Sequence, residues 1–330
     1  MPGFWGQHCR KDQRCEGDGV VGCADHGGGP VGSVEEFTTD RAWEEGGVEA
    51  LVPGSRRGQS VGVIGAGPAG LSAAEYLRAG GYDVHVYDRY DRAGGLLTYG
   101  IPGFKLEKPV VMRRVDRLKA GGIIFHENFE VGRDATLDEL RQRHDAVLIA
   151  TGVYRARAIK APGVEKTGVV DALAFLTASN RKNFGDAVPA FDDGSLNAAG
   201  KHVVVIGGGD TAMDCVRTAI RQNAASVKCL YRRDRANMPG SQREVNNAEE
   251  EGVEFVWLSA PESFTGRDAV SGVKASGMRL GAPDASGRRA PEIDPQGGFD
   301  LPADLVIKAL GFDAEDLPKL FGATFRITVR

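Results

Sequence analysis

Two glycine-rich turns, 142 residues apart, constrain the fold of this 330-residue chain more than any other feature of its sequence. The first is GAGPAG at residues 65–70, which follows a short apolar run and precedes a run of helical character. In a G-x-G-x-x-G turn the first glycine permits the bend, the second lets the backbone approach a pyrophosphate, and the third allows close packing of helix on strand. The pattern therefore predicts a βαβ unit that binds a dinucleotide at the helix N-terminus.

The second turn is GGGDTA at residues 207–212, where Ala212 replaces the third glycine. Alanine is small enough to preserve the close packing, and an apolar run again precedes the turn. Together the two turns predict an α/β fold with two Rossmann-like nucleotide-binding units, the second following the first or inserted into it. A short helical segment precedes both.

The apolar periodicity predicts the elements around these turns. In the first unit the expected strands are 61–64, 83–87, 122–126 and 146–149, and the expected helices are 69–79 and 109–120. In the second unit the expected strands are 201–206, 226–231, 253–257 and 305–307, and the expected helices are 211–222 and 244–251. A capping box of Ser33 and Glu36 predicts a further helix that begins at Ser33 and runs through Trp43. The expected domains are 1–57, 58–160, 161–311 and 312–330, the last being a return to the first nucleotide unit.

The residues that follow the second strand differ between the two units. Asp88 ends that strand in the first unit, at the spacing expected of a carboxylate that accepts a ribose hydroxyl. The second unit has Arg232 and Arg233 there, and guanidinium groups pair with a 2′-phosphate that a carboxylate would repel. These residues predict FAD in the first unit and NADP(H) in the second, with hydride passing between the two cofactors. We therefore assign no catalytic side chain.

Composition and motifs exclude several other classes of function. With 41 Lys and Arg against 45 Asp and Glu, the net charge is −4, and no basic surplus indicates nucleic acid or an anionic membrane as a partner. No apolar run reaches the roughly 18 residues that a membrane span needs. Five cysteines without a disulfide pattern favour a cytoplasmic location.

Hydrolytic and thiol-relay chemistry finds no support either. No C-x-x-C pair follows either glycine turn, the histidines form no H-E-x-x-H motif, and no G-x-S-x-G turn follows a strand. Cys215 lies among apolar helix positions, which is typical of a buried and inert thiol.

The residues from Val61 to Gly311 closely resemble the small (β) subunit of NADPH-dependent glutamate synthase. The resemblance rests on long stretches: VGVIGAGPAGLSAAEYLRAGGYDVHVYDRYDRAGGLLTYGIPGFKLEK, VLIATGVY, GKHVVVIGGGDTAMDCVRTAIRQ, CLYRRDRANMPGSQREV and ADLVIKALGF. In that family the small subunit takes a hydride from NADPH onto FAD. Iron–sulfur clusters then carry electrons to a large subunit that makes glutamate.

Carried over by position, the resemblance implies two sets of cofactor contacts. Those to FAD would come from Gly65, Gly67, Gly70, Asp88, Gly95, Leu96 and Lys105. Those to NADP(H) would come from Gly209, Asp210, Thr211, Arg232, Arg233, Ala309, Leu310 and Gly311, beside the turn glycine Gly207. It also implies a glutamate synthase large subunit as partner.

Both ends of the chain depart from the family pattern. Residues 1–57 resemble the end of the family's cysteine-rich iron–sulfur domain. Only Cys9, Cys15 and Cys23 remain there, with Trp5 and Gly19 at expected ligand positions. A [4Fe–4S] cluster needs four ligands, so we expect the cluster to be lost. After Gly311 the family continues with a third glycine motif that contacts FAD, which this sequence lacks, so weakened FAD binding is expected.

Three interpretations stay open at this point. The chain is the small subunit of glutamate synthase or a truncated form of it, produced as a fragment, a mis-called reading frame or a decayed gene. Alternatively it is a stand-alone NADPH-dependent reductase that serves a ferredoxin-type acceptor. In the third interpretation it is a non-catalytic remnant that binds NADP(H) and holds no flavin.

Overall fold

The structure, a computed structural model, describes residues 31–283 and 289–322 and divides the chain into the compact units Met1–Val52 and Pro53–Arg330. In the N-terminal unit, Met1–Val52, it describes a helix, α2 (Val31–Glu44). Because Val31 already belongs to α2, the expected helix start at Ser33 is wrong by two residues. The helix ends where Gly46 takes a φ of +72°, a conformation that glycine adopts without strain. Cys9, Cys15 and Cys23, on which the predicted cluster loss depends, lie outside the described residues.

The larger unit, Pro53–Arg330, begins with the first nucleotide unit, a parallel four-stranded sheet whose strand order is β3-β2-β1-β4. Its strands are β1 (Ser60–Ile64), β2 (Asp83–Tyr87), β3 (Ile124–His126) and β4 (Ala146–Ile149). Strand β3 starts two residues later than predicted, because Gly122 has a φ of +87° and still belongs to the preceding turn. The strand before the glycine turn therefore lies between β2 and β4, as a dinucleotide-binding sheet requires.

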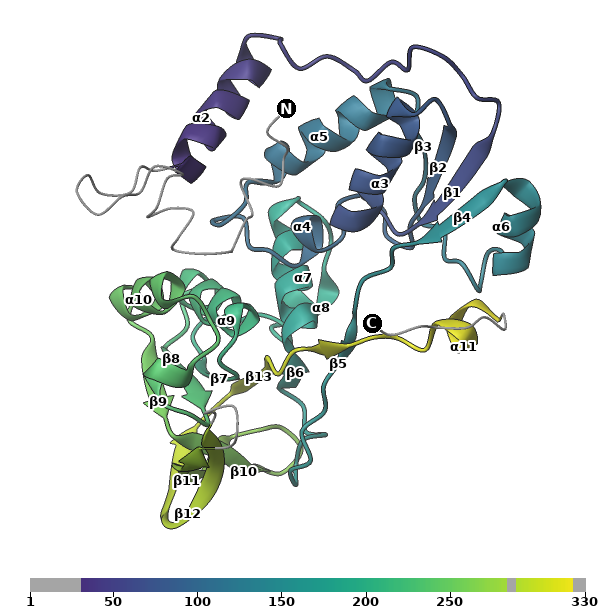
Figure 1. Ribbon diagram of the computed structural model, residues 1–330. Coiled ribbons are helices and arrows are strands. Elements are labelled where there is room, and N and C mark those ends of the chain that lie inside the picture. The colour runs from purple at the N-terminus through teal and green to yellow at the C-terminus, as the bar shows by residue number, and fades with distance from the viewer. Residues whose placement is uncertain (1–30, 284–288, 323–330) are drawn as a thin grey trace. The chain divides into compact units, whose positions relative to one another are not determined.

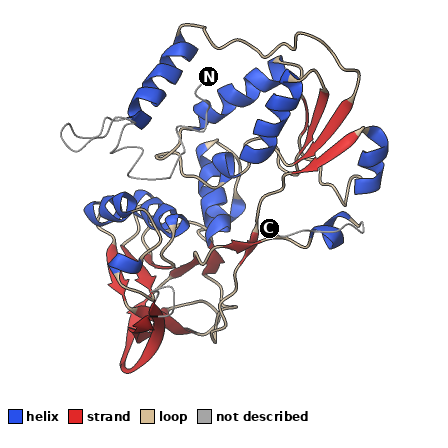
Figure 2. Cartoon of the chain, in the orientation of Figure 1, coloured by secondary structure: helices blue, strands red, loops and turns tan. Residues whose placement is uncertain are grey.

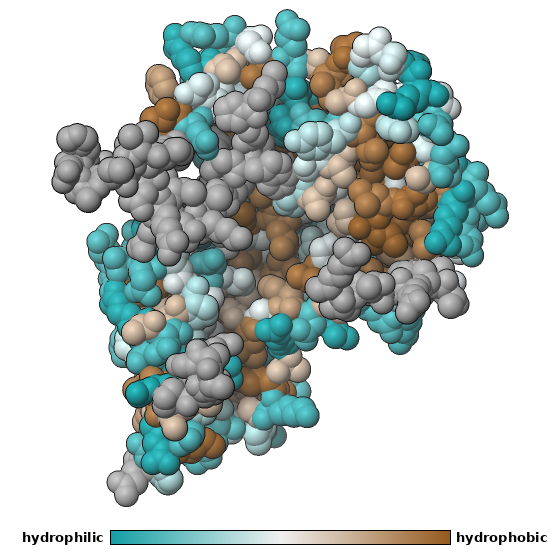
Figure 3. Space-filling view, in the orientation of Figure 1, coloured by the Kyte–Doolittle hydropathy of each residue, from teal (hydrophilic) through white to brown (hydrophobic). Residues whose placement is uncertain are grey.

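Helices cover both faces of this sheet (Figure 1). On one face, α3 (Pro68–Ala79) and α5 (Lys108–Ala120) bury a core that includes Val63, Leu71 and Leu118. On the other face, α6 (Leu137–Arg143) and α11 (Leu317–Phe321) bury a smaller core. The edge strand β4 stays partly open: Leu148 is 40% exposed, and Figure 3 shows apolar surface gathered over β1 and β4.

A second parallel sheet, ordered β6-β13-β7-β8-β9, repeats the arrangement around the second glycine turn. Its strands are β6 (Val169–Asp171), β7 (His202–Ile206), β8 (Ser226–Tyr231), β9 (Glu254–Trp257) and β13 (Leu305–Lys308). Three helices cover one face and bury the largest core of the described residues: α7 (Ala172–Asn183), α9 (Asp210–Arg221) and α10 (Gln242–Glu250). The predicted α/β class with two parallel nucleotide-binding sheets is thereby confirmed.

The opposite face of the second sheet carries an antiparallel layer that the sequence patterns did not predict. It consists of β10 (Ser259–Thr265), β11 (Gly272–Pro283) and β12 (Arg289–Pro302). Val273 and Leu301 of this layer share a core with Val204 and Val306 of the parallel sheet. Figure 2 shows the resulting order of helices, parallel strands and antiparallel strands.

The chain enters and leaves the second sheet system through a pair of short strands. Residues of β5 (Arg155–Ala156) pair antiparallel with those of β14 (Phe312–Asp313). After β14, α11 packs on the first sheet, where Phe321 is 2% exposed. The second nucleotide unit therefore lies between two passes of the chain across the first. Short helices α4 (Leu96–Tyr99) and α8 (Pro189–Asp192) complete the connections. None of the helices among residues 31–283 and 289–322 has the length and apolarity to cross a bilayer.

Candidate dinucleotide sites

A cavity of about 330 Å³ opens at the carboxyl ends of β1, β2 and β4. This is the edge of a parallel sheet at which nucleotides bind. The predicted FAD residues Gly65, Gly67, Asp88 and Leu96 line it. Four of the residues that the sequence assigned to FAD are thus brought to one cavity.

The three glycines of the first turn have distinct surroundings. Gly65 has a φ of +108°, and a side chain there would overlap the carbonyl oxygen of Ala150. A side chain at Gly70 would overlap the carbonyl oxygen of Gly65, so Gly70 is what lets α3 approach the strand. At Gly67, by contrast, a Cβ atom would meet no protein atom within 4 Å. The protein itself leaves that space open at the N-terminus of α3, where unpaired N–H groups favour a phosphate.

Asp88 ties the glycine turn to the end of β2. Its Oδ2 atom accepts a hydrogen bond from the backbone N–H of Ala66 at 2.6 Å, and its Oδ1 atom accepts one from the N–H of Tyr90 at 2.9 Å. Burial raises the pKa of Asp88, against those two backbone hydrogen bonds. Each carboxylate oxygen keeps a further lone pair, so Asp88 can also accept a ribose hydroxyl.

The cavity lining also includes polar residues that the sequence did not indicate, among them Arg89, Thr151, Tyr154 and Glu315. The guanidinium of Arg89 stacks on the ring of Tyr154 at 4.7 Å and pairs with Glu315 at 3.4 Å. Burial raises the pKa of Tyr154, which keeps its hydroxyl protonated and able to donate a hydrogen bond. The position of Thr151, two residues after the end of strand 146–149, was the signal available, because ligands bind at strand carboxyl ends.

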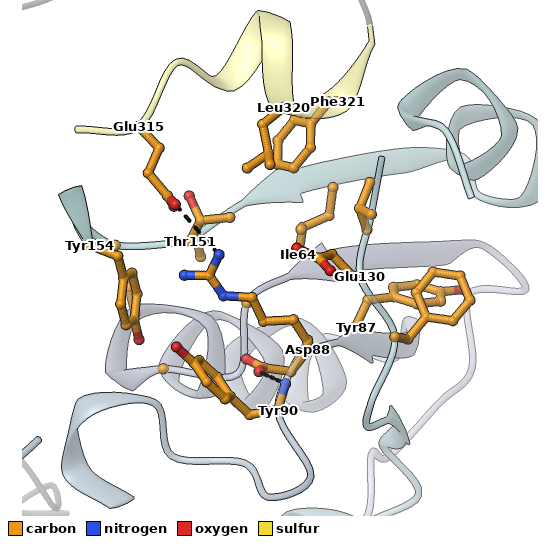
Figure 4. A pocket seen from close by; sticks show the side chains of 18 of the residues that line it. Ile64, Tyr87, Asp88, Tyr90, Glu130, Thr151, Tyr154, Glu315, Leu320 and Phe321 are labelled. Carbon is orange, nitrogen blue, oxygen red and sulfur yellow. Dashed lines mark hydrogen bonds and ion pairs between the residues drawn. The ribbon is translucent and has the colours of Figure 1, made fainter. Parts of the chain in front are cut away.

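The far wall of the cavity comes from the returning chain. Figure 4 shows Leu320 and Phe321 of α11 on the opposite side of the cavity from Asp88 and Tyr90. Together with Ile64 and Tyr87 they make this part of the lining apolar. Apolar walls with a few placed polar groups are typical of a cofactor site.

Of the other predicted FAD residues, Gly95 lies beside the cavity and Lys105 lies away from it. Gly95 lies against the glycine turn, since a Cβ atom at Gly95 would be 2.8 Å from the Cα atom of Gly67. Leu96 begins α4 beside it. Lys105 does not line the cavity; its Nζ atom is 2.7 Å from Asp214 Oδ1 in the second nucleotide unit.

The second glycine turn repeats the geometry of the first. A side chain at Gly207 would overlap the carbonyl oxygen of Ala309, just as one at Gly65 would overlap Ala150. At Gly209, which precedes α9, a Cβ atom would again meet nothing within 4 Å. An open space therefore faces the N-terminus of α9, as it does for α3.

The predicted NADP(H) residues beside this turn fall into two groups. Asp210 and Thr211 form the first turn of α9, and Asp210 Oδ1 accepts a hydrogen bond from the N–H of Ser241 at 3.2 Å. Ala309, Leu310 and Gly311 follow β13 in the position that Ala150, Thr151 and Gly152 hold after β4.

The two predicted arginines stand at the end of β8. Arg232 is exposed, and in the described part of the chain neither a hydrogen bond nor an ion pair occupies its side chain. The Nε atom of Arg233 is buried and lacks a hydrogen-bond partner among those same residues. Arg235, which the chain also offers there, is paired with Glu249 at 2.7 Å. The pair Arg232 and Arg233 is therefore available to an anion.

The two sites fit dinucleotides without a nucleophile. Each has an open space over its second glycine, a helix N-terminus behind that space, and a matching side chain after the second strand: Asp88 in one, Arg232 and Arg233 in the other. Within the described segments, Cys215 and Cys229 are free and buried, and no His, Cys, Asp or Glu group could hold a metal ion. Burial raises the pKa of both thiols, so the thiolate forms are disfavoured.

Comparison with known proteins agrees with this arrangement. The model of the pyridine nucleotide-disulphide oxidoreductase family matches residues 59–324. The glutamate synthase [NADPH] small chain of Azospirillum brasilense is 63% identical over 321 residues, covering 97% of this chain and 67% of that protein. A putative glutamate synthase [NADPH] small chain of Cereibacter sphaeroides is also 63% identical, over 317 residues, covering 96% of this chain and 76% of that one.

A solved structure shares the fold. The structure described as Mycobacterium tuberculosis FprA in complex with NADPH has a TM-score of 0.68 at 19% identity, covering 79% of this chain and 72% of that one. With 63% identity over 97% of this chain, the resemblance seen in the sequence is confirmed. The chain belongs to the pyridine nucleotide-disulphide oxidoreductase family and, within it, to the small chains of NADPH-dependent glutamate synthases.

Proposed function

We propose that this chain oxidises NADPH, delivers the hydride to FAD, and passes electrons to the large subunit of a glutamate synthase. The flavin supplies the two-electron acceptor when it is bound, and the protein binds and orients both cofactors. Its named relatives support the partner and the pathway of glutamate formation. A cytoplasmic location belongs to the same proposal, since both described cysteines are free thiols.

One observation carries the proposal. Gly67 and Gly209, which hold the second glycine position of the G-x-G-x-x-G/A pattern, face space that no protein atom fills. A glycine that the fold does not need for packing is explained by close approach of a ligand. Two such glycines at two helix N-termini fit two pyrophosphates. The side chains beyond them distinguish the ligands, because Asp88 suits a free ribose and Arg232 with Arg233 suits a 2′-phosphate.

The residue roles follow from these positions. We assign Gly65, Gly67, Gly70, Asp88, Gly95 and Leu96 to the FAD site, together with the newly found Thr151 and Tyr154. We assign Gly207, Gly209, Asp210, Thr211, Arg232, Arg233, Ala309, Leu310 and Gly311 to the NADP(H) site.

Anaerobic mixing of the purified full chain, supplied with FAD, tests the first step. NADPH should bleach the visible flavin absorbance, and NADH at equal concentration should do so far more slowly. A Gly209→Val variant is the control, because a Cβ atom at this position meets no protein atom within 4 Å. It should keep FAD and lose reduction by NADPH. Unreduced flavin in a chain that binds both cofactors would contradict the proposal.

Addition of a glutamate synthase large subunit tests the second step. Glutamate formation from 2-oxoglutarate and glutamine should then depend on both chains and on NADPH. If the chain instead reduces a ferredoxin equally well and never supports glutamate formation, it is a stand-alone reductase and the assignment to this partner is wrong.

A further inference from the structure

Lys105 joins the two nucleotide units through a buried ion cluster. It lies in the loop between α4 and α5, and its Nζ atom is 2.7 Å from Asp214 Oδ1 and 3.4 Å from Glu244 Oε2. The side chains of Lys105, Asp214 and Glu244 are only 16%, 6% and 9% exposed. Asp214 belongs to α9 and Glu244 to α10. The ammonium of Lys105, in the first nucleotide unit, therefore contacts two helices of the second nucleotide unit.

Two arginines of α9 complete the cluster. Arg217 donates to Glu244 at 2.7 Å and to Glu251 at 2.7 Å, and Arg221 pairs with Glu251 as well. Both guanidiniums lie over the ring of Phe104, with their Cζ atoms 4.8 Å and 3.8 Å from its centre. Phe104 precedes Lys105 in the chain, so the same loop supplies an apolar and a charged contact.

Among the side chains of these ion pairs, the charges balance only when Lys105 is included. In these pairs the second nucleotide unit supplies three carboxylates, those of Asp214, Glu244 and Glu251. It supplies only two positive charges, the guanidiniums of Arg217 and Arg221. Lys105 supplies the third positive charge. Removing one partner from a buried ion cluster leaves a buried charge under-compensated, which is strongly unfavourable.

A second contact holds the other end of the same segment. Arg181 pairs with Asp91 at 3.0 Å, and the Nδ2 atom of Asn180 donates to the carbonyl oxygens of Tyr99 and Ile101 at 3.0 and 3.2 Å. Both Asn180 and Arg181 belong to α7. Residues 91–105, which carry Gly95 and Leu96 at the FAD cavity, are therefore attached to the second unit at both ends.

The attached helix is also the one whose N-terminus faces the open space at Gly209. Asp214 lies on α9 five residues after Gly209, so the pair of Lys105 and Asp214 connects the predicted NADP(H) site to the segment beside the FAD cavity. We propose that Lys105 is a positioning residue: it fixes α9 against residues 91–105 and thereby sets how the two dinucleotides meet for hydride transfer. This inference rests on the function proposed above, and it replaces the direct FAD contact that resemblance implied for Lys105.

The matched test compares Lys105→Met with Lys274→Met. Lys274 pairs with Glu262 at 2.9 Å, about half exposed, in the antiparallel layer away from either glycine turn. The first readout is hydrogen–deuterium exchange of the full chain without cofactors. Exchange should rise in peptides covering 95–106 and 210–217 in Lys105→Met, and stay unchanged in Lys274→Met. Lys105→Arg should restore the original exchange, and Asp214→Asn should reproduce the effect of Lys105→Met.

The second readout separates positioning from binding. In Lys105→Met the rate of flavin reduction by bound NADPH should fall by roughly 10- to 100-fold, because small misplacements of reacting groups cost about that much. The dissociation constants of FAD and of NADPH, each measured alone, should stay within about threefold of the unmodified chain. Lys105→Arg should recover most of the rate.

Three results would overturn the inference. A large rise in the FAD dissociation constant with normal reduction of the bound flavin would make Lys105 a direct flavin contact. Unchanged exchange and an unchanged rate would show that the ion cluster has no positioning role. A rate loss that Lys105→Arg does not recover at all would do the same. If the unmodified chain itself fails to transfer hydride, the proposed function fails, and the exchange experiment still decides whether Lys105 couples the two units.

Discussion

The Oδ2 atom of Asp88 accepts a hydrogen bond from the backbone N–H of Ala66 at 2.6 Å, so the carboxylate expected to bind a ribose also holds the glycine turn in shape. On the proposed function, one side chain would therefore serve both the fold and the ligand. Asp88 is 9% exposed, and its removal leaves the buried N–H of Ala66 and the partly buried N–H of Tyr90 without their acceptor.

Asp88→Ala should accordingly destabilise the chain as well as weaken nucleotide binding. We expect the free energy of unfolding to fall by about 2–4 kcal/mol, since one buried and one partly buried N–H group lose their acceptor, at about 1–3 kcal/mol for a buried group. Urea unfolding measures this, with the exposed Asp138→Ala as a control that should change little. Equal stability of the two variants would show that the hydrogen bonds of Asp88 are dispensable.

Gly67 and Gly70 should separate binding from folding. Gly67→Ala places a methyl group in open space, so the free energy of unfolding should change by no more than about 1 kcal/mol. The same methyl group would stand where a pyrophosphate approaches, and affinity for ADP should drop at least about tenfold. Titration with ADP and urea unfolding of the same samples check both statements.

Gly70→Ala is predicted to behave in the opposite way. Its methyl group would overlap the carbonyl oxygen of Gly65, so α3 must move away from β1 at a cost of about 3 kcal/mol or more. If Gly70→Ala proves as stable as Gly67→Ala, the close packing attributed to this position is wrong.

The double substitution of Arg232 and Arg233 by Ala should remove the preference for NADPH over NADH. Loss of charge-assisted hydrogen bonds worth about 1.5–3 kcal/mol corresponds to a 10- to 100-fold weaker affinity for NADPH. Affinity for NADH should stay the same, because NADH lacks the 2′-phosphate. Fluorescence titration with both nucleotides measures the ratio. Arg235→Ala is the control, since Arg235 already pairs with Glu249.

A group of three histidines should make the first sheet sensitive to acid. His85 Nδ1 lies 3.0 Å from His126 Nε2, and His144 Nε2 lies 2.8 Å from the hydroxyl of Tyr87. Burial lowers the pKa of all three histidines, and for His126 and His144 neighbouring positive charge lowers it further. With a folded-state pKa below the ordinary 6.5, each histidine binds more protons in the unfolded chain as the pH falls.

Stability from these groups is therefore fully present above pH 6.5 and is lost as the pH falls through the folded-state pKa values. His126→Phe keeps a ring stacked on Tyr87, whose centre is now 4.4 Å from that of His126, and removes one titrating group. The free energy of unfolding can be measured with urea at about pH 7.5 and at about pH 5. Between these two values His126→Phe should lose less stability than the unmodified chain. The exposed His202→Gln should follow the unmodified chain; identical pH profiles for all three proteins would disprove the prediction.

The sequence predicted those parts of the fold in which short apolar strands flank a glycine turn. Helix α3 begins at Pro68 where Ala69 was expected, and α9 begins at Asp210 where Thr211 was expected. Helix α6 was missed although its signal is present: Thr136 and Glu139 form a capping box. Helix ends of this kind can be read locally, because the capping residues are neighbours in sequence.

The antiparallel layer and the ion cluster could not be found in that way. Strands β11 and β12 contain glycines and prolines that break the alternation of apolar and polar residues, and Gly277 stands against Gly297 across the pair. Lys105 and Asp214 are 109 residues apart in sequence. No periodicity or spacing rule joins such residues, because only the packing of the two nucleotide units brings them together.

Because Cys215 and Cys229 are buried, the rate at which their thiols react reports how often the surrounding core unfolds locally. Cys215 of α9 and Cys229 of β8 lie in the same core and are 0% exposed, so a thiol reagent reaches them only when that core opens. Alkylation followed by mass spectrometry resolves the two peptides from those of the remaining cysteines. The labelling rate of each cysteine then measures how often the second nucleotide unit opens. A bound dinucleotide should slow both rates in proportion to its affinity.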